Sequence, residues 1–147
     1  MQTTRRHARE WAIQMLTAAD LNPPEDIDLL IESFWTNLPT LSEDGQKCPK
    51  PGKKLKAFAE ELVKGVLANL DGLDGELSVL LENWDLYRLG TIERVVLRMG
   101  VWELKNSDVP KAVVINESID LVNWYSSPKS RTLVNGVLDR YAAKVGR

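Results

Sequence analysis

Apolar residues recur at three- and four-residue steps along most of the chain, which is the spacing of amphipathic helices with one buried face. The first stripe begins at Ala8, and Thr3 or Thr4 is placed to cap its helix. Asn22-Pro23-Pro24 then interrupts the pattern. Because proline fits the first turn of a helix, these prolines predict the start of a second helix, with its stripe over residues 27–38.

Five further helices are predicted from the same spacing. The third covers about residues 54–70, and the pairs Asp71-Gly72 and Asp74-Gly75 predict a break before a short fourth helix that ends near Trp84. The last three helices are each predicted to begin at a capping residue or a proline. These starts are Thr91 after Gly90, Pro110, and Ser127-Pro128.

Two β-branched runs, at residues 94–98 and 112–116, look like buried strands when taken alone. Each lies within a longer helical stripe, and no hairpin turn pairs them, so both are predicted to be helical. The expected fold is therefore all-α, a bundle of about seven helices with orthogonal packing.

Length and composition fit one globular domain. The chain has 147 residues, of which 44% are hydrophobic and 27% charged, so it is long enough to bury a core. We expect a single domain over residues 1–147. Prolines and glycines concentrate at residues 39–54, which predicts a mobile loop there.

Charge is segregated along the chain although the net charge is only −2. Eight acidic residues and no Lys or Arg lie between Glu10 and Gln46. A lysine cluster follows, and because it falls in the proline-rich stretch, a solvated loop is its favoured interpretation over a phosphate site. Its members are Lys47, Lys50, Lys53, Lys54 and Lys56.

The strongest candidate site is the basic start of the first helix. Arg5, Arg6 and Arg9 lie there with His7, and no acid precedes Glu10. Guanidinium groups bind phosphate oxygens through two hydrogen bonds and stack on exposed bases, so the cluster favours single-stranded RNA. Cations at a helix N-terminus oppose the helix dipole, and a role in stability alone would favour acids.

Catalytic chemistry is not indicated. The chain has one histidine and one cysteine, His7 and Cys48, and neither a glycine-rich phosphate loop nor a Glu-x-x-His metal motif. We expect no enzyme activity, cofactor or metal. A lone cysteine fits a reducing compartment, and without a signal peptide or an apolar membrane-spanning run the expected location is the cytoplasm.

A series of segments runs in order along nearly the whole chain. The segments are Arg5-Arg-His-Ala-Arg-Glu10, Phe58-Ala-Glu-Glu-Leu-Val-Lys-Gly65, Asn83-Trp-Asp-Leu-Tyr-Arg-Leu-Gly90, Glu93-Arg-Val-Val-Leu-Arg-Met-Gly-Val-Trp-Glu-Leu104, Asp108-Val-Pro110, Ile115-Asn-Glu-Ser-Ile-Asp-Leu121 and Val134-Asn-Gly-Val-Leu-Asp139. In this order they resemble the bacterial NusB family of transcription antitermination proteins.

The resemblance implies a seven-helix fold and a role in transcribing ribosomal RNA operons. Members bind boxA RNA together with NusE, a ribosomal small-subunit protein, and join other Nus factors on RNA polymerase, without a cofactor. By position, the resemblance assigns RNA contacts to the arginine-rich helix start and, secondarily, to Lys129 and Arg131. It assigns contacts with NusE to Glu93 and Leu133. Asn116 and Asn135 are interpreted as internal hydrogen-bonding residues.

Three positions depart from the family pattern. His7 replaces the usual Arg or Lys and is largely uncharged at neutral pH. Thr17 stands where an aromatic residue is common, which removes a stacking surface. Leu133 replaces the usual Phe and reduces the aromatic area available to NusE.

Two other functions fit the sequence less well. One is a helical scaffold that binds only protein. The other is an accessory domain acting with a separate ribosomal RNA methyltransferase, since NusB-like folds also precede such enzymes. Trp11 and Trp84 are expected in the core, whereas Trp102 and Trp124 lie near stripe edges, where an exposed indole can serve a heterodimer or a homodimer.

Overall fold

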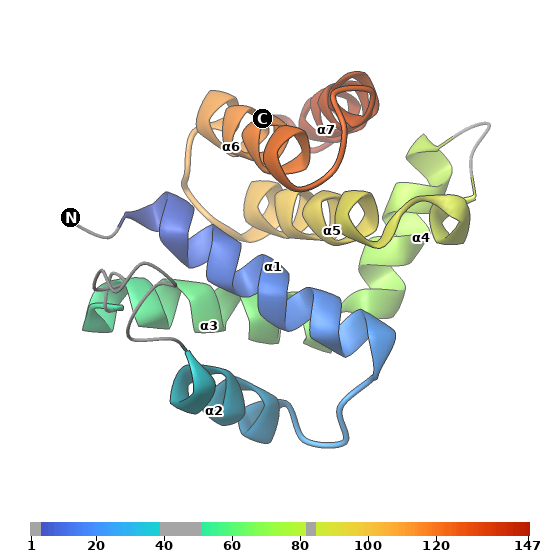
Figure 1. The fold of residues 1–147 in the computed structure, drawn as a ribbon. Coiled ribbons are helices and arrows are strands. Elements are labelled where there is room, and N and C mark those ends of the chain that lie inside the picture. The colour runs from blue at the N-terminus through green and yellow to red at the C-terminus, as the bar shows by residue number, and fades with distance from the viewer. Residues whose placement is uncertain (1–3, 39–50, 82–84) are drawn as a thin grey trace. The chain divides into compact units, whose positions relative to one another are not determined.

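A computed structural model describes residues 4–38, 51–81 and 85–147 of the chain (Figure 1). Seven α-helices and one short 3₁₀ helix account for most of these residues, which confirms the all-α prediction and the helical assignment of both β-branched runs. The elements are α1 (Arg5–Leu21), α2 (Ile27–Asn37), α3 (Lys53–Ala68), α4 (Leu70–Leu80), η1 (Leu86–Arg88), α5 (Thr91–Asn106), α6 (Lys111–Tyr125) and α7 (Ser130–Lys144).

The starts of the first two helices are set by the capping residues that precede them. Thr4 is the N-cap of α1, as predicted. In α2 the cap is Asp26, whose carboxylate accepts hydrogen bonds from the backbone N–H groups of Asp28 at 2.9 Å and Leu29 at 3.3 Å. The prolines of the 22–24 segment therefore precede the helix rather than start it, because the first free N–H groups need an acceptor.

The predicted break at the two Asp-Gly pairs is wrong. Gly72 and Gly75 lie inside α4, which begins at Leu70 and ends at Leu80. The helix continues because Leu73, Leu77 and Leu80 are buried on one face, and this burial outweighs the low helix propensity of glycine. Trp84, predicted for the core, lies outside the described residues.

Backbone contacts divide the chain into two compact units, Met1–Lys64 and Gly65–Arg147. The expectation of one domain over residues 1–147 stays a prediction. The loop expected at residues 39–54 lies mostly outside the described part of the chain. For its last two residues the prediction is wrong, because Lys53 and Lys54 belong to the first turn of α3. Gly52 starts that helix, since its carbonyl accepts the N–H of Lys56 at 2.9 Å.

Three helices pack together in the first unit through aromatic rings. Trp11 of α1 meets Trp35 of α2 edge to face, with ring centroids 5.5 Å apart. The Trp35 indole N–H donates to Glu60 Oε1 of α3 at 2.8 Å. The tryptophan of α2 therefore ties both neighbouring helices together.

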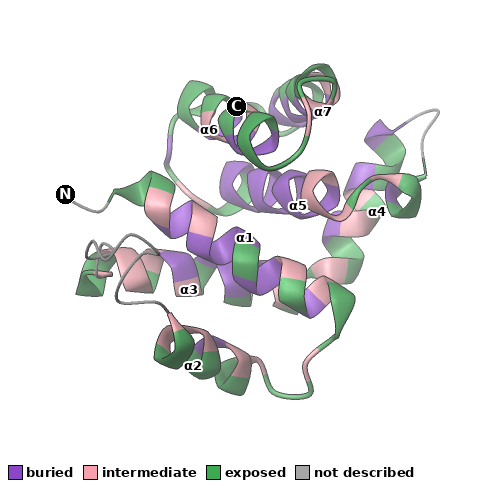
Figure 2. Cartoon of the chain, viewed as in Figure 1, coloured by how far each residue is buried: buried purple, intermediate pink, exposed green. Residues whose placement is uncertain are grey.

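Helix α5 is the centre of the second unit. Every residue from Arg94 to Leu104 is buried, so this helix is enclosed on all sides, as the purple ribbon in Figure 2 shows. Gly100 permits the close approach of α6 and α7, because a Cβ there would lie 2.9 Å from Leu138 Cδ1 and 3.3 Å from Ser118 Oγ. No larger residue fits this crossing without displacing a neighbour.

A second close approach joins the end of α3 to α5. A Cβ on Gly65 would overlap Cε2 and Nε1 of the Trp102 ring, with both atoms closer than 3.0 Å. Trp102 is only 9% exposed, so this indole is a core residue and not the interface residue that its place at a stripe edge suggested. The Trp102 ring occupies the space that a side chain at position 65 would need.

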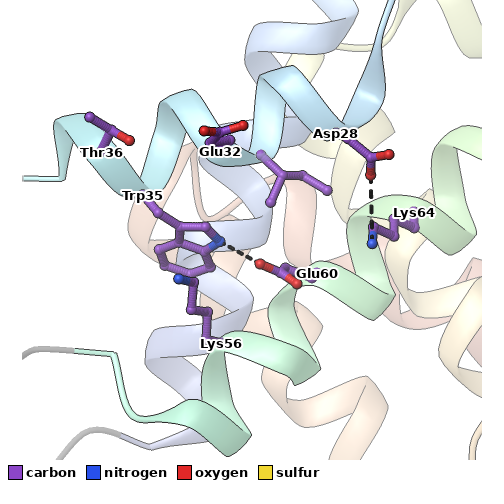
Figure 3. A pocket seen from close by; sticks show the side chains of 8 residues that line it. Asp28, Glu32, Trp35, Thr36, Lys56, Glu60 and Lys64 are labelled. Atoms are coloured by element: carbon purple, nitrogen blue, oxygen red, sulfur yellow. Dashed lines mark hydrogen bonds and ion pairs between the residues drawn. The ribbon is translucent and has the colours of Figure 1, made fainter.

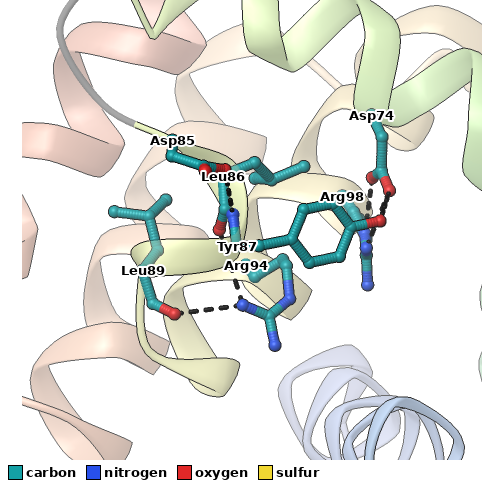
Figure 4. A network of polar contacts seen from close by, with 7 residues as sticks. All are labelled: Asp74, Asp85, Leu86, Tyr87, Leu89, Arg94 and Arg98. Carbon is teal, nitrogen blue, oxygen red and sulfur yellow. Dashed lines mark hydrogen bonds and ion pairs between the residues drawn. The ribbon is translucent and has the colours of Figure 1, made fainter.

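A polar network clamps η1 to α4 and α5 (Figure 4). Arg98 binds both carboxylate oxygens of Asp74, at 2.7 and 2.9 Å, and Tyr87 OH donates to the same carboxylate at 2.8 Å. Arg94 donates to the carbonyl of Leu89 at 3.0 Å, with its guanidinium over the Tyr87 ring at 5.4 Å. Two arginines from one helix thus hold the short segment in place.

Candidate nucleic-acid interface

The basic segment opens α1, where a cap fixes its geometry. Nδ1 of His7 accepts the backbone N–H of Thr4 at 3.0 Å, and the ring lies near Trp11 with centroids 6.3 Å apart. His7 is half-buried. The histidine that replaces a family cation therefore completes the helix cap, a task that an ammonium or guanidinium group has no acceptor to perform.

Phe58 of α3 connects two of the arginines. The guanidinium carbon of Arg5 lies 4.9 Å from the centroid of the Phe58 ring, and that of Arg9 lies 5.2 Å from it. These distances are those of cation–π contacts. The ring thus orients guanidinium groups from successive turns of α1 and keeps their forked N–H donors together.

The arginines differ in their access to solvent. Arg5 and Arg6 are exposed, whereas Arg9 is only 4% exposed. The sequence predicted an RNA contact for each of the three residues, because helical spacing does not show which side of α1 packs against Phe58 of α3. The side chains of Arg5 and Arg6 thus reach solvent, whereas Arg9 is buried against the Phe58 ring.

Lys129 and Arg131, the secondary RNA candidates, both lie at the start of α7 and are exposed. They belong to the second unit, while the arginines of α1 belong to the first. Asn116 and Asn135 are also exposed, so their interpretation as internal residues is wrong. The side chain of Asn116 on α6 and that of Asn135 on α7 both face water.

The two predicted partner-contact residues are neighbours in the second unit. Oε1 of Glu93, in the first turn of α5, accepts hydrogen bonds from Ser126 Oγ and, at 2.6 Å, from Ser130 Oγ. Leu133 follows Ser130 by three residues in α7, on the same side of the helix, and is half-buried. One surface therefore contains both candidates.

Hydrogen bonding also sets the charge state of Glu93. Burial opposes ionisation of its carboxyl, but the hydroxyl groups of Ser126 and Ser130 stabilise the anion and lower its pKa below the ordinary 4.5. A negative charge therefore persists at the junction of α5 with the α6–α7 connection.

A group with a lowered folded-state pKa stabilises the fold above its unfolded pKa, and this contribution is lost as pH falls through the folded pKa. We expect Glu93→Gln to lower the melting temperature by a few degrees at pH 7. The difference from the parent chain should begin to shrink below about pH 4.5 and should disappear only when the pH is below the lowered folded-state pKa. Thermal unfolding followed by circular dichroism between pH 3 and 7 measures it, and a constant difference over that range would contradict the assignment.

Trp124 is the most exposed large apolar side chain among the residues that the structure describes, at 79%. It is the next-to-last residue of α6 and precedes Ser126, which donates to Glu93, by two residues. The sequence interpretation of Trp124 as an interface residue agrees with this exposure. The chain near Ser126 thus carries an indole that is open to water, and large exposed apolar groups are common in interaction surfaces.

A groove in the first unit lies between α2 and α3 (Figure 3). Its volume is about 300 Å³, and Lys56 lies over the Trp35 ring with Nζ 5.3 Å from the centroid. Lys64 pairs with Asp28 at 3.7 Å. Charges of both signs line this groove, so it has no strong preference for an anion. The lining residues are Asp28, Ile31, Glu32, Trp35, Thr36, Lys56, Glu60 and Lys64.

Other kinds of site receive no support from the described residues. Within residues 4–38, 51–81 and 85–147, no group of three or more His, Cys, Asp or Glu side chains is placed to hold a metal ion. None of the helices in these ranges is long and apolar enough to cross a membrane. Cys48, set aside as a nucleophile at the sequence level, lies outside them.

These features define an all-helical protein with a basic, helix-borne surface of the kind that binds a phosphate chain. The profile of the NusB family matches residues 6–143, so the chain belongs to the NusB family. The transcription antitermination protein NusB of a Nitratiruptor species is 39% identical over 142 residues, covering 97% of this chain and 94% of the relative. NusB of Sorangium cellulosum is 36% identical over 144 residues, with 97% and 94% covered.

Solved structures agree with this assignment. NusB of T. maritima has a TM-score of 0.79 and 33% identity, and the match covers 97% of this chain and 93% of that one. A chain in a crystal structure of antitermination factors NusB and NusE in complex with dsRNA has a TM-score of 0.76 and 27% identity, with 95% and 96% covered. The resemblance seen in the sequence motifs is therefore confirmed, together with the fold it implied.

Proposed function

We propose that this chain is a transcription antitermination factor that binds boxA RNA of ribosomal RNA operons together with NusE. The complex then joins other Nus factors on RNA polymerase in the bacterial cytoplasm. The observation that carries the proposal is the exposure of Arg5 and Arg6 at the start of α1 in a chain of the NusB family. The similar chain that was solved with NusE and dsRNA supports NusE and RNA as partners.

The proposed role is one of binding, and each part of the surface contributes differently. Arg5 and Arg6 contact phosphates and bases directly, and Arg9 supports them through Phe58. His7 acts through the helix cap, and Lys129 and Arg131 are further RNA contacts. Glu93 and Leu133 contact NusE, and the neighbouring Trp124 supplies aromatic area that Leu133 lacks.

Charge reversal of Arg5 and Arg6 tests the RNA site. Each phosphate contact to a single strand contributes about 0.7 to the slope of log K against log salt, or about fivefold in affinity near 0.1 M salt. We expect the Arg5→Glu, Arg6→Glu variant to bind a boxA-like RNA at least about 25-fold more weakly at that salt. The melting temperature should change by only a few degrees, since both side chains are exposed and the contact of Arg5 with Phe58 contributes about 0.5–1 kcal/mol.

The measurement is fluorescence anisotropy of labelled RNA, with and without NusE, at two salt concentrations. Arg88→Glu combined with Lys111→Glu is the matched control, because both residues are exposed and belong to the second unit. Unchanged RNA affinity in the arginine variant would refute the site. Tight NusE binding with no RNA binding under any condition would favour the protein-only scaffold instead.

A further inference from the structure

Helix α3 carries lysines on two different faces. Lys56, Glu60 and Lys64 follow one another at four-residue steps and line the groove toward α2. Lys54 and Phe58 also lie four residues apart, about 200° around the helix from Lys56 at 100° per residue. The lysines of one short segment therefore have different surroundings.

The lysines that face α2 are engaged. Lys56 covers the ring of Trp35, whose indole N–H is bound to Glu60. Lys64 lies 3.7 Å from Asp28. Both amines thus have a partner within the unit, and carboxylates beside them cancel their positive potential.

The other face of α3 continues the arginine surface. Phe58 lies under Arg5 and Arg9, at 4.9 and 5.2 Å. Lys54 precedes Phe58 by one helical turn, about 6 Å along the axis, and is exposed. Lys53 is also exposed, but at 100° per residue it lies about 140° from Phe58 and about 60° from Lys56, so Lys54 alone continues the Phe58 side. The basic starts of α1 and α3 therefore meet at one aromatic ring.

Local stability does not account for these lysines. The first turn of α3 contains no acid, although acids are the residues that a helix N-terminus favours. The acid nearest to Phe58 on this side of α3 is Glu61, three residues in the C-terminal direction and away from Lys54. An anion that reaches Arg5 thus approaches positive charge on both helices.

We propose that Lys54 extends the RNA-binding surface from α1 onto α3, where its ammonium group contacts a phosphate next to those held by Arg5 and Arg6. The inference rests on the proposed RNA-binding function and makes it more specific. It corrects the interpretation of Lys54 as part of a solvated loop. Lys53, Lys56 and Lys64 remain outside the surface.

Two charge-removing variants of α3 test the inference. Lys54→Gln removes one charge from the proposed surface, and Lys64→Gln, at a residue that is also exposed, removes one from the groove face. We expect Lys54→Gln to lower the salt slope by about 0.7 and the affinity for a boxA-like single-stranded RNA about fivefold near 0.1 M salt. The loss should shrink toward 1 M salt, and Lys64→Gln should change the affinity less than twofold.

The Arg5→Glu, Arg6→Glu variant, titrated in parallel, separates the two proposals. Full RNA affinity in Lys54→Gln with a loss in the arginine variant would confine the site to α1 and overturn the inference alone. Equal losses in Lys54→Gln and Lys64→Gln would also overturn it, because net charge would then explain them. No loss in any variant would refute the proposed function as well.

Discussion

Replacement of Arg98 by methionine is expected to lower the free energy of unfolding by about 3 kcal/mol, in the range for breaking one side of a buried ion pair. The side chain of Arg98 is 6% exposed and that of Asp74 is 14% exposed. Without the guanidinium, the carboxylate keeps the hydroxyl of Tyr87 but loses two short hydrogen bonds. For a chain of this size, the loss corresponds to about 6–12 °C in melting temperature.

The same pair of helices provides a control. Lys105 of α5 pairs with Glu76 of α4 at 2.9 Å, but the two side chains are 51% and 29% exposed. Lys105→Met should therefore cost no more than about 1 kcal/mol. Adding Asp74→Leu to Arg98→Met should restore more than half of the lost stability, because the unpaired buried charge is gone. Equal effects of Arg98→Met and Lys105→Met in urea unfolding would refute this account.

The second large effect is expected from one methyl group at Gly65. Its Cβ would overlap Cε2 and Nε1 of Trp102, a ring that is itself buried. Overpacking of this kind costs about 1–3 kcal/mol or more, and alanine recovers about 1 kcal/mol in helix propensity. We expect Gly65→Ala to lose about 2 kcal/mol net, with a shift in tryptophan fluorescence as the indole moves.

Gly75 is the matched glycine. It also lies within a helix, but a Cβ placed there would have no atom within 4 Å other than its chain neighbours and the backbone of its own helix. Gly75→Ala should therefore raise stability by about 0.5–1 kcal/mol. If both alanine variants raise the urea midpoint, then helix propensity, and not the contact with the indole, determines the effect of Gly65→Ala on stability.

The helices were predictable wherever apolar spacing was long and regular. The β-branched runs of α5 and α6 were assigned correctly because each lies within a longer stripe. The Asp-Gly pairs misled because local propensity disfavours the helix there, while burial of Leu73 and Leu77 in the folded unit favours it. The start of α2 was misplaced because proline fits a first turn, whereas the carboxylate of Asp26, two residues beyond Pro24, is the group that caps this helix.

The candidate site was found from sequence only as a set of charges. Spacing showed that Arg5 and Arg9 share a face of α1, but not that Phe58 of another helix covers that face. The burial of Arg9 and the cap role of His7 follow from that packing and from the backbone of Thr4. Contacts between helices distant in sequence leave no periodic signal, so single-chain patterns could not reveal them.

The solvent-exposed indole at the end of α6 gives the second unit an intrinsic optical reporter. Trp11 and Trp102 are 7% and 9% exposed, so aqueous quenchers reach them poorly, whereas Trp124 is open to solvent. We expect its emission at the red edge of the spectrum, with a shift to the blue when a macromolecule covers the indole. Occupation of the surface around the end of α6 can therefore be followed without any attached dye.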